Sequence, residues 1–118
     1  MQGIEKHFVR WGAILLALGM VVGLYMAATE NFKIGSVHAH LAIFGGAVLI
    51  IYGLVYHAGL AKNDIWAVVL LWISVIGAIA FPLGEYFAIT AGAHVAAGIA
   101  SLIVLASGLL FVFNVVRA

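Results

Sequence analysis

Long uncharged segments decide the fold of this chain, and residues 65–83 are typical of them: they read IWAVVLLWISVIGAIAFPL. A helix that crosses the hydrocarbon core of a bilayer needs about 20 mainly apolar residues. Three further apolar runs lie at residues 11–28, 37–61 and 87–116. Of the 118 residues, 67% are hydrophobic and 8% are charged, whereas soluble domains carry about 25% charged residues. We therefore predict an all-α protein with four transmembrane helices.

Polar and turn-forming residues separate the apolar runs and set the expected helix ends. We expect the helices at about residues 8–29, 36–58, 64–83 and 86–117, in one domain of residues 1–118. Pro82 is expected to end the third helix, because proline breaks a helix interior. Ser36 and Asp64 are expected to be N-caps, since their side-chain oxygens accept from free amides. Short loops predict an up-down-up-down order.

The basic residues are divided unevenly between the two expected membrane faces. Lys6, Arg10, Lys62 and Arg117 lie on the side that holds both termini, and Lys33 lies on the other. Because basic loops stay inside, we expect both termini to be cytoplasmic, in the inner (plasma) membrane of a bacterium or archaeon. The net charge of +1 offers no basic surface for nucleic acid. Membrane lipid is the expected partner.

Histidines are the informative polar residues. The expected second helix begins near His38 and His40, and the fourth begins near His94. These two helices run in the same direction, so the three imidazoles should lie at a similar depth near the outer face. Glu30 and Glu85 end the first and third helices at that face. We predict an outer cluster of these five side chains, each histidine having a simple interfacial role as its alternative.

Two other histidines, His7 and His57, lie at the cytoplasmic ends of the first and second helices. An imidazole at the membrane interface can hydrogen-bond to water or to backbone carbonyls. We therefore expect ordinary interfacial roles for both, and treat them as weaker candidates for a metal or second cofactor site.

Helical geometry separates His38 from His40. Two residues turn an α-helix by about 200°, so the two imidazoles should face different partners. On an α-helix, His38 shares a face with Tyr52 and Tyr56, among mainly small residues. The predicted companions of His40 are bulkier: Phe44, Ala47, Ile51 and Leu54.

The absence of cysteine excludes iron–sulfur clusters and thiolate metal sites, so His, Met, carboxylate or Tyr must hold any metal or cofactor. Haem b fits best, because it is mostly apolar and needs one or two imidazoles. Our leading prediction is haem held by His40 or His38 together with His94. A copper or zinc binding or transport protein that uses His38, His40, His94, Glu30 and Glu85 is the alternative. A helical scaffold whose histidines merely pack is the third possibility.

Residues 38–46, which read HAHLAIFGG, resemble the His-x-His helix of haem-copper oxidase catalytic subunits and the related nitric oxide reductases. In that family the two histidines lie on opposite faces of one helix and bind two haems. The ending at residues 110–117, LFVFNVVR, also resembles some helix ends of the family. The resemblance implies that His38 and His40 are haem or metal ligands. The chain has no His-Pro-Glu motif and no His-His pair, so the family's dinuclear centre is not encoded in one copy.

Twelve helices form three arcs of four in that family, and this chain resembles one arc. The resemblance therefore implies a homo-oligomer, with a trimer favoured. The sequence has no Ser-His-Asp set, no phosphate-binding glycine loop and no catalytic carboxylate pair. We expect a small b-type cytochrome that serves electron transfer or haem and gas binding, not an enzyme on its own. A redox partner or quinol is implied, and Tyr86 beside Glu85 is a minor quinol candidate.

Overall fold

The computed structural model of the chain describes residues 3–118, so the first two residues of the expected 1–118 domain lie outside it. Within the described residues the chain forms four long helices that are apolar and long enough to cross a membrane. In chain order these are α1 (Ile4–Thr29), a composite helix from Gly35 to His57, α4 (Ile65–Ala91) and α5 (Val95–Val116). The prediction of an all-helical chain with four helices able to span a membrane is confirmed for residues 3–118.

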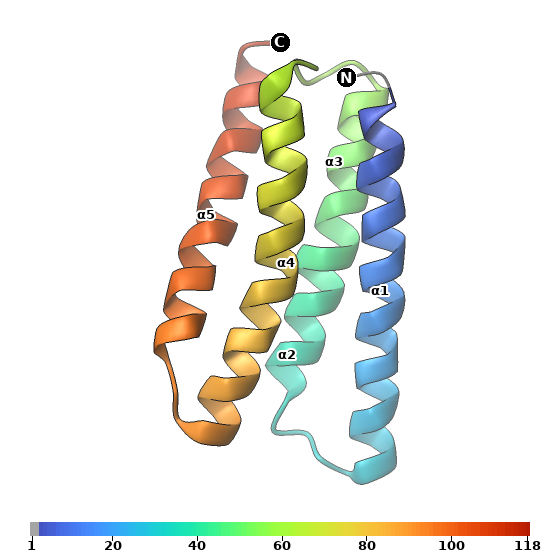
Figure 1. Cartoon of the computed structure of the whole chain (residues 1–118). Helices are drawn as coiled ribbons and strands as arrows, with labels where there is room; N and C mark the ends of the chain where they lie inside the picture. Colours follow the sequence, from blue (N-terminus) through green and yellow to red (C-terminus); the bar gives the residue numbers. More distant parts are fainter. Residues whose placement is uncertain (1–2) are drawn as a thin grey trace.

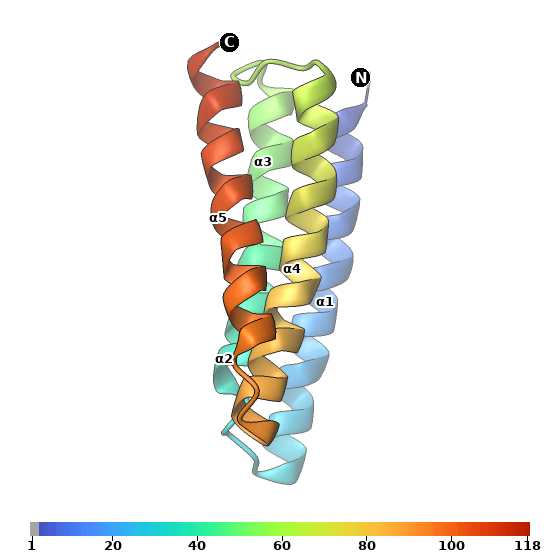
Figure 2. The same cartoon turned by 60° about the vertical axis from the view of Figure 1, so that its left-hand side comes forward.

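The four helices run side by side along the long axis of the bundle (Figure 1). Both chain ends lie at the same end of the bundle as the loop between α3 and α4, and the other two turns lie at the opposite end (Figures 1 and 2). α5 lies on α4, on the side away from α1 (Figure 1). Many large apolar side chains, such as Leu24, Ile65 and Val116, are exposed on the outer surface. In a bilayer, lipid covers such a surface.

The end of α4 differs from the prediction. α4 continues through Pro82 to Ala91, ends at Gly92 with a left-handed φ of 67°, and is followed by α5 from Val95. Proline removes a single backbone donor, and membrane helices tolerate it where neighbouring helices pack closely. Pro82 is buried here, and next to it Gly84 lies against the backbone of α5 at Ala97. The predicted boundaries at residues 83 and 86 are therefore wrong.

Other boundaries follow the sequence more closely. Asp64 is the N-cap of α4, as predicted, and accepts a hydrogen bond from the Trp66 amide at 3.1 Å. The N-cap prediction for Ser36 is wrong, because the second helix already begins at Gly35 and no side chain caps it. α1 begins at Ile4 instead of residue 8.

The second membrane helix is not a regular α-helix. It consists of α2 (Gly35–His40), a π-helical segment η1 (Leu41–Ala47) and α3 (Val48–His57). A π-helix pairs residues five apart instead of four, so it turns the chain less per residue than an α-helix. The predicted face of His38 nevertheless stays together: Ala42, Gly45 and Gly53 lie against α1, as His38 does. Of the predicted companions of His40, Phe44 stacks on its ring, whereas Ile51 and Leu54 are exposed.

Close helix contact holds α1 against the second membrane helix. A Cβ atom on Gly46 would lie 2.8 Å from Leu16 Cβ, and one on Gly19 would lie 3.0 Å from Ala42 Cβ. Small residues permit this approach in lipid, where no hydrophobic force drives helices together. The backbone carbonyls of α1 thereby come within reach of side chains on α2.

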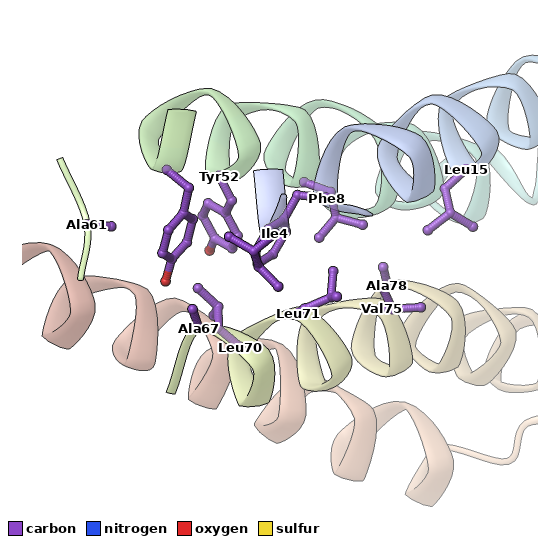
Figure 3. Close-up of a cluster of buried hydrophobic side chains, with 12 residues drawn as sticks. Ile4, Phe8, Leu15, Tyr52, Ala61, Ala67, Leu70, Leu71, Val75 and Ala78 are labelled. Atoms are coloured by element: carbon purple, nitrogen blue, oxygen red, sulfur yellow. The ribbon is translucent and has the colours of Figure 1, made fainter. Parts of the chain in front are cut away.

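The larger cluster of buried apolar side chains includes the first turns of α1, the end of α3 and the first half of α4. Figure 3 shows Ile4, Phe8 and Tyr52 facing Leu70 and Leu71 of α4. All five side chains are buried. The Phe8 ring stacks on Tyr56, at 5.4 Å between ring centroids, and meets Tyr52 edge-on. A smaller buried cluster of Met26, Ile34 and Val37 lies near the opposite end, close to His38.

Candidate functional site

His40 and Glu85 form a hydrogen-bonded contact between α2 and α4. The Nδ1 atom of His40 lies 2.5 Å from Oε1 of Glu85. The sequence predicted Glu85 at the end of a helix, but α4 continues past Pro82. Because α4 continues, Glu85 lies on the side of this helix that faces α2. The pair therefore depends on a helical extension that the prediction missed.

Aromatic rings surround the imidazole of His40. Phe44 stacks on it, with ring centroids 5.2 Å apart and planes 18° apart, and Phe81 lies at 5.0 Å. The side chain of His40 is 33% exposed and that of Glu85 is 13% exposed. The carboxylate is therefore largely sheltered, while part of the imidazole remains accessible.

The carboxylate determines what the His40 ring can do. An ionised carboxylate can only accept a hydrogen bond, so Nδ1 of a neutral His40 carries the proton and donates it to Glu85. The lone pair of Nε2 then remains available. Histidines that bind metals almost always donate their other ring N–H to a carboxylate or a carbonyl. The His40–Glu85 pair has the same arrangement.

His38 is held in a similar way on the opposite side of α2. Its Nδ1 lies 2.6 Å from the backbone carbonyl oxygen of Gly19 on α1. The ring packs so closely on α1 that a Cβ on Gly23 would lie 2.8 Å from its Cε1. Because a carbonyl only accepts, Nδ1 is again the donor. His38 and His40 thus face different helices, as predicted.

The remaining members of the predicted outer cluster do not join these two histidines. His94 is exposed just before α5, and Glu30 is exposed after α1, with a left-handed φ of 52°. Among residues 3–118, no three His, Cys, Asp or Glu side chains form a group that could hold a metal ion. Of the five clustered candidates, the structure therefore brings only His40 and Glu85 into direct contact.

His7 and His57 lie at the opposite end of the bundle. His57 is exposed at the end of α3, where it lines a shallow groove with Lys6 and Arg10 of α1, and His7 is half-buried on α1. Neither lies near His40. Their placement is that of residues near a membrane surface.

A buried polar network near the chain termini was not predicted. The Asn114 side chain, which is fully buried, donates to the Tyr56 hydroxyl at 2.9 Å and accepts from Arg117 at 2.8 Å. Arg117 also makes two hydrogen bonds to Asp64, at 2.7 and 2.8 Å. These bonds hold the pKa of Asp64 down at about 2 instead of 3.8 and raise the pKa of Arg117. A lone Asn near the end of an apolar helix was the sequence feature that could have indicated this network.

The chain was also compared with known proteins. No family model, curated protein or solved structure matches it.

Proposed function

We propose that this chain is a small haem-binding membrane protein of the b type, in which His40 would hold the haem iron and Glu85 orients His40. The observation that carries the proposal is the contact of His40 Nδ1 with Glu85 at 2.5 Å, which leaves Nε2 free. When bound, haem iron supplies one-electron redox chemistry or a binding position for a small gas.

The donor set favours haem over copper or zinc. Zinc sites take three or four protein ligands, and the described residues contain no group of three. A haem needs one or two imidazoles. His40 supplies one, with Phe44 and Phe81 providing apolar aromatic surface beside it.

A second axial ligand would determine which kind of haem protein this is. His38, held by the Gly19 carbonyl, faces α1, and His94 is exposed. A single ligand from His40 leaves an open position suited to gas binding. A second imidazole from another copy of the chain would favour electron transfer, and an oligomer such as a trimer would supply it.

We place the end of the bundle that carries both termini on the cytoplasmic side. Lys6, Arg10, Lys62 and Arg117 belong to that end, and Lys33 lies at the other. The positive-inside rule supports this orientation and suits the inner membrane of a bacterium or archaeon. His40 and Glu85 would then lie in the outer half of the bilayer.

The proposal is tested by measuring haem bound per chain after expression with ample haem. We expect a Soret band in the wild type, its loss in His40→Ala, and its retention in His57→Ala, the matched control at the far end. Glu85→Ala should bind haem about 10–100-fold more weakly, as for other residues that orient a metal ligand. Full haem content in His40→Ala would contradict the assignment.

Elemental analysis of the same samples separates the remaining possibilities. Stoichiometric copper or zinc without haem would favour the metal-binding alternative. A protein that is colourless and metal-free, and that tolerates alanine at residues 38, 40 and 94, would be a scaffold.

A further inference from the structure

A cavity of about 150 Å³ lies inside the bundle, between the second membrane helix, α4 and α5. Its walls are mainly apolar, but three hydroxyl-bearing residues line it: Tyr52, Ser74 and Ser107. Phe44, Val48 and Tyr52 of the second membrane helix line one side of this space. Neither His40 nor Glu85 lines it, so the cavity is separate from their contact.

Ser74 is the key residue of this cavity. It is 6% exposed, and its Oγ has no hydrogen-bond partner among residues 3–118. The two serines of α5 do have hydrogen-bond partners. Ser101 donates to the Gly98 carbonyl and Ser107 donates to the Val104 carbonyl, both at 2.7 Å. A buried hydroxyl without a partner destabilises the fold, so a small ligand that hydrogen-bonds to Ser74 is favoured here.

A second polar side chain lines the same space from α5. Ser107 is 6% exposed, and its hydroxyl donates to the Val104 carbonyl, so its oxygen can still accept a hydrogen bond. Tyr52 lines the cavity too, and its ring stacks on Phe111 with centroids 4.0 Å apart. The cavity therefore offers a donor on α4 and an acceptor on α5.

We propose that this cavity is an internal water site, in which ordered water bridges the Ser74 hydroxyl and the Ser107 oxygen. Buried water makes about three hydrogen bonds to otherwise unsatisfied groups, and one molecule takes about 30 Å³ in the liquid. The cavity has the polar partners and the room for more than one molecule. A lipid chain would satisfy neither hydroxyl.

Radiolytic hydroxyl-radical footprinting of the full chain in lipid nanodiscs tests this site, because bound water produces radicals beside the side chains that it touches. We expect oxidation of Tyr52 and Phe44 in the wild type. Ser74→Val, which fills the space and removes the hydroxyl, should reduce Tyr52 oxidation several-fold. Ser101→Val, at an exposed serine outside the cavity, should leave it unchanged, and the exposed Phe32 serves as the internal reference. Equal Tyr52 oxidation in wild type and Ser74→Val would overturn the proposal.

Thermal unfolding of Ser74→Ala gives an independent answer that does not depend on filling the cavity. If water satisfies the hydroxyl, removing the hydroxyl loses hydrogen bonds, and the unfolding temperature should fall. If the hydroxyl is unsatisfied, its removal relieves a cost, and the unfolding temperature should rise. A rise would overturn the proposal, whatever the haem content of the sample.

Discussion

Asn114 is fully buried, and its amide connects three elements of the fold. It donates to Tyr56 and to the Trp66 carbonyl, and it accepts from Arg117. Replacing Asn114 with leucine keeps the side-chain volume similar, but Tyr56 and Arg117 lose their hydrogen bonds to residue 114. We expect Asn114→Leu to lower the free energy of unfolding by about 1–3 kcal/mol, measured by denaturant unfolding in detergent. Ser101→Ala, on the exposed face of α5, should change it by less than about 0.5 kcal/mol. Equal changes in the free energy of unfolding for the two variants would contradict a stabilising role of the Asn114 network.

The Asp64–Arg117 pair predicts a pH dependence. The hydrogen bonds from Arg117 lower the pKa of Asp64 from 3.8 to about 2. A depressed carboxyl pKa adds stability above the unfolded pKa, and that stability is lost as the pH falls through the folded pKa. We expect the unfolding temperature of the wild type to fall between about pH 4 and about pH 2. The unfolding temperature of Asp64→Asn should fall less over that range. If the unfolding temperatures of the two proteins change in parallel with pH, the pair contributes nothing.

At the scale of elements, one glycine on α4 controls the contact with α5. A Cβ on Gly84 would lie 2.7 Å from the backbone nitrogen of Ala97, whereas one on Gly98 of α5 would meet nothing within 4 Å. Backbone atoms cannot move aside cheaply. We expect Gly84→Ala to destabilise the protein by about 1–3 kcal/mol through overpacking. Gly98→Ala should stabilise it by about 0.5–1 kcal/mol. If denaturant unfolding shows that both variants change the free energy of unfolding in the same direction, this account is contradicted.

The elements also show how far sequence reasoning reaches. Apolar length predicts four helices, because the bilayer demands it, and the 200° separation of His38 and His40 survives because both lie in regular α2. The π-helix at Leu41–Ala47 was not predicted, yet the small residues beyond its start still face α1 as expected. Pro82 misleads because α5 packs closely beside α4, which stays helical beyond the proline.

These two irregularities also explain the partial prediction of the site. Depth along the bundle follows from helix direction, which the sequence indicates well. Direct contact depends on rotation about each helix axis, which π-helical and proline-containing segments change. Hence Glu85 reaches His40, while Glu30 and His94 remain exposed at their helix ends.

For the whole molecule, the arrangement of the helices predicts which turns share a membrane face. The native chain has no cysteine, so single cysteines can report it. We expect Glu30→Cys and Ala93→Cys to react with an impermeant maleimide on intact cells, because both turns lie at the end opposite the termini. Asn63→Cys should react only after permeabilisation. Labelling of Glu30→Cys and Ala93→Cys from opposite sides would refute the shared depth of His40 and Glu85.

The central claim for the whole molecule is that an imidazole oriented by a carboxylate inside the bundle binds haem. The visible absorption spectrum of the purified full-length protein, oxidised and then reduced, tests it most directly. We predict a Soret band that sharpens and shifts on reduction, together with the α band of a b-type haem, all dependent on His40. A spectrum without a Soret band, from cells supplied with ample haem, would contradict the claim.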